Sequence, residues 1–362
     1  MVPMETYNTE KDKNYSKVYP LRILAWEVTR SCNLNCVHCR ASSKYGHYPL
    51  ELNTSKAKEV LDQIREVGEP IVILTGGEPL LREDIFDLAD YGTKKGLRMV
   101  MGTNGTLITS GIAKKILKSG IKRVSISLDG ATKETHDSFR KVDGAFEMAN
   151  AGISYLREHD VEFQINTTIT THNLSELEEV LKLSINLGAA AHHIFLLVPT
   201  GRAKDMVNQE LDAQQYEDTL HWFYQQHDKV PLQLKATCAP HYYRILRQEE
   251  HAKGRKVNVK THGLDAVTRG CMAGVSYCFI SNEGIVQPCG YLDLNSGDLR
   301  KSTFLNIWKS SPIFKDLRDF SKYKGKCGRC EYINVCGGCR ARAYAATGDY
   351  LSEEPLCAYI PQ

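Results

Sequence analysis

The chain has 362 residues, of which 42% are hydrophobic and 25% charged, which is ordinary for a globular protein with one large and one smaller domain. Its formal net charge of +3 is close to balance and argues against a strong nucleic-acid binder, although a local basic pocket for an acidic ligand stays compatible with it. No apolar run approaches the ~18 residues that cross a bilayer, and the first residues lack a signal-peptide core. We therefore expect a cytoplasmic protein without a membrane span.

Residues 21–200 alternate between apolar runs of strand length and segments with helical spacing. Strands are expected at 21–30, 70–79, 97–105, 121–130, 161–170 and 191–201, and helices near 55–68, 84–95, 109–118, 145–158 and 174–187. Six such units predict an α/β fold with a parallel sheet, either curved or open. In such folds ligands gather at the carboxyl ends of the strands, where every glycine-rich or polar motif described below falls.

The rest of the chain divides at residue 271. Residues 201–270 predict a connector with one helix around 211–227, whereas Gly, Cys and short turns dominate from 271 onward, with one helix near 303–320. This tail has too little apolar content for a large core, so we expect bound metal to hold it together. The predicted organisation is an N-terminal extension (1–20), a βα domain (21–200), the connector (201–270) and a cysteine-rich domain (271–362).

Twelve cysteines are unusual in a reducing compartment and indicate metal binding or redox chemistry. Cys32, Cys36 and Cys39 lie within "CNLNCVHC", and eight more lie between residues 271 and 357. Three thiolates on one loop can hold three irons of a cubane cluster and leave the fourth iron open for a small molecule. The alternative is half of a zinc site whose fourth ligand comes from elsewhere in the chain.

The cysteine loop at the end of the first strand, followed by "TGGEP" at the end of the second, resembles the radical S-adenosylmethionine (SAM) enzymes over about residues 21–200. This resemblance implies a six-fold βα partial TIM barrel and a [4Fe–4S] cluster whose open iron binds SAM. It also implies that Gly76, Gly77 and Glu78 receive the SAM ammonium group. The physical chemistry agrees, because glycines let the backbone come close and a carboxylate or strand-end carbonyl accepts from a cation.

Three further residues are candidates for SAM binding by the same resemblance. Asn104 in "GTNG" and Ser127 in "SISLDG" lie at the third and fourth strand ends, where ribose and carboxylate contacts are expected. Arg140 in "HDSFRKV" is a candidate partner for the SAM carboxylate. Ordinary turn chemistry is the alternative reading of these positions.

The cysteine spacing of the tail resembles the SPASM-type extension that many radical SAM enzymes carry. Its start is Cys271, Gly284 and Cys289, and the family usually has three residues, where this chain has two, before the cysteine that corresponds to Cys339. The family's interleaved pattern implies two auxiliary [4Fe–4S] clusters. The first would be held by Cys271, Cys278, Cys289 and Cys339, and the second by Cys327, Cys330, Cys336 and Cys357. Zinc is the alternative metal, which would hold the fold together but carry no electrons.

Longer stretches, among them "KATCAPHYYRILR" and "CGGCRARAYAATGDYL", are similar to the haem b synthases of the alternative, sirohaem-derived pathway. Related families act in haem d1 synthesis or remove acetate side chains from tetrapyrroles. The resemblance implies oxidative decarboxylation of two propionates of Fe-coproporphyrin III to vinyl groups, with SAM, three [4Fe–4S] clusters and a low-potential electron donor. A peptide-modifying SPASM enzyme and a zinc-stapled binding protein without catalysis are the alternatives.

A tetrapyrrole substrate carries carboxylates around a flat apolar face, which suits arginine and aromatic side chains. Both Cys and His are known ligands of haem iron. The candidates are Arg202, Arg244 and Arg269 for the carboxylates, Tyr242 and Tyr243 for the ring, and Cys238 and His241 for the substrate iron. Solvated charges, core tyrosines and an inert buried cysteine are the alternative readings.

Overall fold

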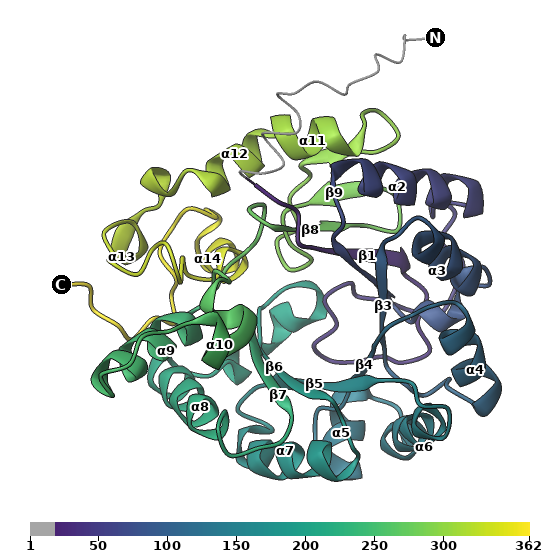
Figure 1. Cartoon of the computed structure of the whole chain (residues 1–362), viewed down its shortest axis with the longest axis horizontal. Coiled ribbons are helices and arrows are strands. Elements are labelled where there is room, and N and C mark those ends of the chain that lie inside the picture. The colour runs from purple at the N-terminus through teal and green to yellow at the C-terminus, as the bar shows by residue number, and fades with distance from the viewer. Residues whose placement is uncertain (1–18) are drawn as a thin grey trace.

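The computed structural model describes residues 19–362, so residues 1–18 of the predicted N-terminal extension lie outside its described part. One sheet runs through the molecule in the order β10-β9-β8-β1-β2-β3-β4-β5-β6-β7. All pairs from β8 through β1 to β7 are parallel, and β9 and β10 add an antiparallel end. Figure 1 shows the strands curving around a central axis, with helices on the outside. This confirms the predicted α/β partial barrel.

The bounds of the elements follow the chain. The strands are β1 (Ile23–Thr29), β2 (Ile71–Gly76), β3 (Arg98–Thr103), β4 (Val124–Ser127), β5 (Phe163–Ile169), β6 (Ala191–Leu196), β7 (Gln233–Thr237), β8 (Tyr277–Ile280), β9 (Ile285–Gln287) and β10 (Gly297–Asp298). The helices are α2 (Thr54–Val67), α3 (Ile85–Lys94), α4 (Ser110–Lys118), α5 (Lys133–Arg140), α6 (Ala145–Glu158), α7 (Leu177–Asn186), α8 (Ala213–Gln226), α9 (His241–Ala252), α10 (Val259–His262), α11 (Phe304–Ser310), α12 (Pro312–Arg318), α13 (Gly325–Gly328) and α14 (Arg340–Thr347).

All six predicted strands are present, and the structure adds elements that the sequence pattern did not predict. The connector contributes β7, a seventh parallel strand paired with β6, and α9 follows it directly. The helix expected near 303–320 is two helices, because Pro312 has no backbone N–H and starts α12 instead of continuing α11.

The cysteine-rich tail shares the core of the barrel, which corrects the expectation that metal alone holds it. Phe304 and Trp308 of α11 are fully buried in the same hydrophobic cluster as Leu61 and Ile64 of α2. Burying each such aromatic side chain is worth about 1.5–3 kcal/mol. Figure 1 shows the C-terminal segment, in yellow, between α9 on one side and α12 on the other. The tail therefore lies against both ends of the open barrel.

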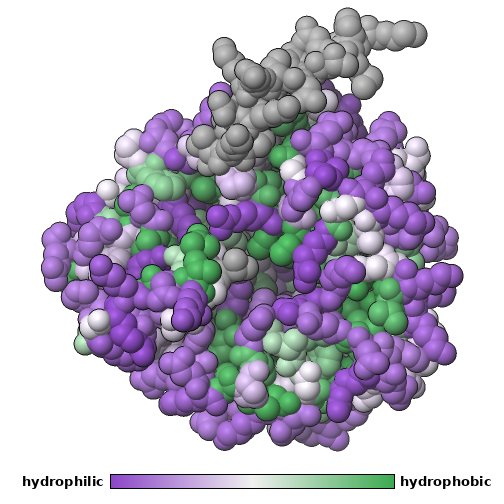
Figure 2. Space-filling model, viewed as in Figure 1, coloured by the Kyte–Doolittle hydropathy of each residue, from purple (hydrophilic) through white to green (hydrophobic). Residues whose placement is uncertain are grey.

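The outer surface seen along the barrel axis is mostly hydrophilic, with hydrophobic residues in smaller patches (Figure 2). Among the helices of residues 19–362, none combines the length and the apolar character that crossing a membrane requires.

Candidate cluster and cofactor sites

The first cysteine loop follows β1 and is held in place from the end of β6. Cys32 and Cys36 are buried, and Cys39 packs against them. Arg202 donates from Nε to the carbonyl oxygen of Cys36 (2.8 Å) and from Nη1 to that of Ser43 (2.7 Å). The guanidinium that we expected at a substrate carboxylate therefore holds the backbone of the cysteine loop, which corrects that expectation.

The thiols of this loop receive N–H donors, as metal-bound thiolates do. Burial raises the pKa of Cys32 to about 12, so iron must displace a proton that the thiol otherwise keeps. N–H donors stabilise the anionic form against this burial and fit an iron–sulfur cluster. They are Leu34 N to Cys32 Sγ (3.4 Å), Ser43 N to Cys39 Sγ (3.4 Å) and Arg140 Nη1 to Cys36 Sγ (3.5 Å).

Arg140 is buried beside the loop and forms an ion pair with Asp129, with 2.5 Å between Nη2 and Oδ2. Although burial opposes its ionisation, the positive charges of Arg140 and nearby histidines hold the pKa of Asp129 below its usual range. Asp129 also accepts from Thr168 N (2.8 Å), which fixes the carboxylate against β5. Sequence reasoning missed this partner because an Asp–Gly pair after a strand is typical of a turn.

Gly76 and Gly77 join β2 to the cysteine loop at very close range. A Cβ on Gly76 would stand 2.2 Å from the carbonyl oxygen of Thr29, and one on Gly77 would stand 2.2 Å from that of Ser31. Gly77 N donates to Thr29 O (2.8 Å). Only glycine fits at either position, so the motif fixes the distance between the second strand end and the first cysteines.

Glu78 is fully buried, and its carboxylate is engaged within the protein. It accepts from Thr103 Oγ1 (2.7 Å), Asn104 N (2.8 Å) and Leu80 N (3.1 Å). Burial raises its pKa to about 7 in spite of these donors. With both oxygens engaged, the strand-end carbonyls are the better acceptors for an ammonium group, which was one of the two possibilities that the motif left open.

The other two predicted SAM contacts also lie at this edge of the sheet. The side chain of Asn104 donates from Nδ2 to Asn33 Oδ1 (2.9 Å) and so connects the end of β3 to the cysteine loop. Ser127 is the last residue of β4 and is half-buried. Their contacts to a ribose or a carboxylate stay predictions.

A cavity in the C-terminal region is lined by Cys327, Cys330, Cys336 and Cys357, the four thiols that the resemblance implies for the second auxiliary cluster. His241 lines the same cavity, fully buried, with neither ring nitrogen hydrogen-bonded within the described residues. Burial lowers its pKa to about 4, so the ring is neutral and keeps one N–H to donate to a cluster sulfur. These residues fit a cluster, and His241 lies at its wall, which corrects its expected place at a substrate iron.

The remaining arginine candidates pack within the protein. Arg244 pairs with Glu217, with 2.5 Å between Nη2 and Oε2, and its guanidinium lies 4.9 Å from the ring centre of Tyr359. Arg269 stacks 3.6 Å from the ring centre of Phe320. Both arginines thus stabilise the cysteine-rich region, which corrects their expected role at substrate carboxylates.

Tyr242 and Tyr243 lie on α9 in the second hydrophobic cluster of the protein. Their side chains are 1% and 2% exposed, and Tyr243 donates its hydroxyl to Asp265 (3.3 Å). This placement corrects the expectation that they flank a macrocycle and favours the reading of core tyrosines.

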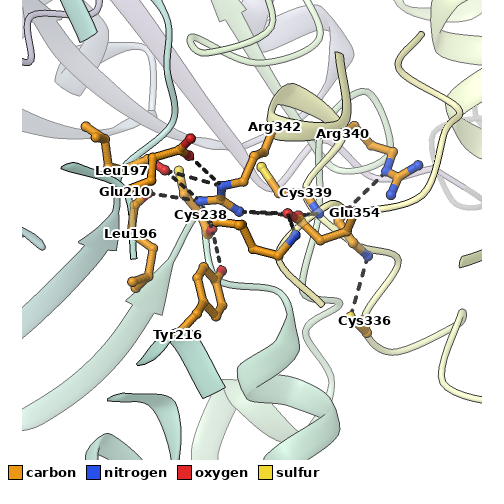
Figure 3. A network of polar contacts seen from close by, with 12 residues as sticks. Leu196, Leu197, Glu210, Tyr216, Cys238, Cys336, Cys339, Arg340, Arg342 and Glu354 are labelled. Carbon is orange, nitrogen blue, oxygen red and sulfur yellow. Dashed lines mark hydrogen bonds and ion pairs between the residues drawn. The ribbon is translucent and has the colours of Figure 1, made fainter. Parts of the chain in front are cut away.

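A buried polar network that sequence reasoning missed connects the tail to the barrel (Figure 3). Arg342 of α14 donates from Nη2 to the carbonyl oxygens of Leu197 (2.8 Å) and Cys238 (3.2 Å). Its Nη1 lies 3.2 Å from Oε2 of Glu354, which accepts from Cys339 N (2.6 Å). The available signal was two arginines among small residues in "CRARA", because charged side chains in a cysteine-dense stretch are seldom free on the surface.

The thiols expected in the first auxiliary cluster come together only in part. Cys289 and Cys339 pack in one cluster, and the charge of Cys271 acts on both. Cys278 lies instead in the barrel core. Within residues 19–362 no group of three His, Cys, Asp or Glu side chains is close enough to hold a single ion. A cubane does not need that proximity, because each of its thiolates binds a different iron.

Replacing Gly201 by alanine is expected to remove the iron of the first cluster, about four atoms per chain. Gly201 has φ +59°, and a Cβ there would stand 2.1 Å from Arg40 O in the cysteine loop. The control is Gly254→Ala, with φ +67° and no atom within 4 Å, which costs only the strain of about 1–2 kcal/mol. Iron analysis of both purified variants tests this, and equal iron contents would contradict it.

Comparison with known proteins agrees with this arrangement. Residues 26–184 match the radical SAM superfamily, and residues 271–340 match SPASM, an iron–sulfur cluster-binding domain. The chain is 52% identical over 340 residues to the AdoMet-dependent heme synthase of Methanosarcina barkeri, covering 94% of this chain and 97% of the relative. It is 30% identical over 352 residues to the Fe-coproporphyrin III synthase of the same organism, covering 92% and 87%. The SAM-bound structure of Streptococcus suis SuiB shares the fold, with a TM-score of 0.75 at 18% identity over 96% and 81% of the two chains.

Proposed function

This chain belongs to the radical SAM enzymes that carry a SPASM iron–sulfur domain, and we propose that within this family it is a haem synthase. Its cofactors are [4Fe–4S] clusters and SAM. One observation carries the proposal. The likeness to an AdoMet-dependent heme synthase extends over 94% of the chain at 52% identity, far above the 30% identity to the Fe-coproporphyrin III synthase.

The proposed reaction converts two propionates of Fe-coproporphyrin III to vinyl groups and gives haem b. The reduced first cluster and SAM together supply a 5′-deoxyadenosyl radical, which takes one hydrogen atom from each propionate. Loss of that hydrogen from the carbon next to the ring leaves a radical beside the carbon that bears the carboxylate. Release of CO2 and one electron then completes the vinyl group. No strong base is needed, because the carboxylate leaves as CO2, but an electron acceptor is.

The contact between the two metal regions supports a short route for that electron. Arg40 follows Cys39 in the chain, and its guanidinium lies 4.4 Å from the ring centre of Phe279. Its Nη1 donates to the carbonyl oxygen of Gly290 (3.5 Å), the residue after Cys289. Neighbours of a first-loop cysteine and of an auxiliary cysteine therefore touch, so the substrate radical and an auxiliary cluster would lie close together. We further propose that a separate low-potential donor reduces the first cluster.

The residues at the first site have roles within this proposal. Cys32, Cys36 and Cys39 would each hold one iron, and strand-end carbonyls at Gly76 and Gly77 would accept from the SAM ammonium. Arg140, at 3.5 Å from Cys36 Sγ, would meet the SAM carboxylate. The functional units would be the barrel over 21–200 and the SPASM-type region over 271–362.

Anaerobic incubation of the reduced, iron-loaded protein with SAM and Fe-coproporphyrin III is expected to give a product lighter by two CO2 and four hydrogen atoms. One 5′-deoxyadenosine should form for each propionate that reacts. Mass spectrometry of the porphyrin and chromatography of the nucleoside measure both, and samples without reductant or without SAM are the controls. Turnover of didecarboxysirohaem, with loss of acetate side chains and no reaction of Fe-coproporphyrin III, would place the chain with the acetate-removing relatives.

A further inference from the structure

The first auxiliary group, Cys271, Cys289 and Cys339, lacks its expected fourth thiol in the structure. That thiol was predicted to be Cys278, which is the second residue of β8. Successive side chains of a strand point to opposite faces, so Tyr277 and Phe279 share one face of β8 and Cys278 takes the other. Phe279 faces Arg40 and the first cysteine loop, on the inside of the barrel. Cys278 therefore points away from that space.

The surroundings of Cys278 confirm this direction. It pairs in register with Leu24 of β1, and both side chains are fully buried. It belongs to the same hydrophobic cluster as Trp308 and Phe314, which come from the helices outside the sheet. A thiol there is a core side chain, since free cysteine behaves as a small hydrophobic residue when buried.

Cys238 occupies the neighbourhood that Cys278 does not reach. It follows the last residue of β7 and packs with Cys289 and Cys339 in one cluster. After burial, the largest effects that raise the pKa of Cys238 are the charges of Cys339 and Cys289, and Cys271 acts in the same direction. Figure 3 shows Cys238 beside Cys339. Four thiols thus converge here from three separate parts of the chain: the end of β7, the region around β8, and the start of α14.

The backbone of Cys238 is held in an unfavourable conformation that aims it at this place. Its φ is +55°, in the left-handed region that costs a residue with a side chain about 1–2 kcal/mol. Two buried donors fix its carbonyl oxygen, the hydroxyl of Tyr216 (3.0 Å) and Nη2 of Arg342 (3.2 Å). Strain of this kind persists where the surrounding structure imposes it and is common at functional sites.

We propose that Cys238 is the fourth thiolate of the auxiliary cluster held by Cys271, Cys289 and Cys339, and that Cys278 is no ligand. The inference rests on the iron–sulfur chemistry of the family and is independent of which substrate the enzyme takes. The ligand set departs from the spacing pattern of the tail, because one member comes from the barrel. A cluster with four thiolates has no open iron, so it would transfer electrons and not bind substrate. It would also fasten the last barrel strand to the tail.

The decisive test compares Cys238→Ala with Cys278→Ala in the full chain, each combined with alanine at Cys32, Cys36 and Cys39 so that only auxiliary clusters remain. Every sample is oxidised with one equivalent of ferricyanide under anaerobic conditions. A [4Fe–4S]2+ cluster with three thiolates then releases its unligated iron as Fe2+ and gives up one electron to ferricyanide, which leaves [3Fe–4S]+. Electron paramagnetic resonance detects that product.

We expect the [3Fe–4S]+ signal, or loss of about four irons, in Cys238→Ala alone. Cys278→Ala should match the parent protein in both iron content and spectrum. Cys238→Ser guards against misfolding, since it keeps the side-chain shape and a weaker oxygen ligand, and it should retain the iron with an altered spectrum. An unchanged Cys238→Ala protein, or a signal that appears in Cys278→Ala instead, overturns the proposal. Neither result depends on turnover, so failure here is distinct from failure of the proposed reaction.

Discussion

Replacing Cys32, Cys36 and Cys39 together by alanine is expected to abolish 5′-deoxyadenosine formation while about eight of about twelve irons stay bound. The three thiols converge on one loop next to the glycines of β2, and the chain has two further thiol groups of its own. Removing the first set therefore removes the site at which SAM binds and leaves the auxiliary clusters. Iron analysis and nucleoside chromatography on the same anaerobic sample measure both quantities.

The control for this variant is Cys278→Ala, which removes a thiol from the barrel core. It should keep about twelve irons and form 5′-deoxyadenosine at the rate of the parent protein. Deoxyadenosine in the triple variant would show that radical formation uses other ligands. Loss of all iron from the triple variant would instead show that the tail cannot keep its clusters without the first loop.

The parts that sequence analysis predicted well are those whose physical cause is local. The six barrel strands follow from apolar runs closed by glycines or turn residues, and the first cysteine loop follows from three thiols in eight positions. The four thiols around the His241 cavity follow from closely spaced cysteine pairs and one distant partner. In each case the chain brings the residues together over a short distance or along one strand end.

The parts that it predicted poorly depend on packing between distant segments. Cys278 and Cys238 are both single cysteines near a strand, and only the register of β8 on β1 decides which of them faces the other thiols. Arg202 and Arg244 looked like ligands for carboxylates, because a sequence does not reveal that a carbonyl or a glutamate already engages the guanidinium. Asp129 and Glu354 were missed for the same reason, since their partners are far away in the chain.

Glu354 connects both auxiliary thiol groups and the barrel, although it lies outside every recognised motif. Its carboxylate accepts from Cys339 N (2.6 Å) and lies 3.2 Å from Nη1 of Arg342, and its own N–H points to Cys327 Sγ (3.4 Å). It is fully buried. Although burial opposes its ionisation, the charge of Arg342 holds the pKa of Glu354 below its usual range, so it is an anion in the folded protein.

Replacing Glu354 by glutamine is expected to destabilise the iron-loaded protein by about 3 kcal/mol, because it leaves the buried Arg342 without its full counter-charge. For a chain of this size that corresponds to a fall of about 4 °C in the thermal midpoint. Arg342 keeps its bonds to the barrel carbonyls, so we expect the loss to fall on the tail. Auxiliary iron should therefore be released at lower temperature than the iron of the first cluster.

Circular dichroism during heating gives the midpoint, and a chelator that absorbs on binding iron reports its release in the same scan. Glu178→Gln is the matched control, because Glu178 forms an exposed ion pair with Lys182 (2.7 Å) that solvent screens, and it should leave the midpoint unchanged. Equal midpoints for the two variants would mean that the Glu354–Arg342 pair contributes nothing to holding the tail on the barrel. A fall confined to Glu354→Gln, with early loss of auxiliary iron, would identify the pair as the link between the two halves of the electron path.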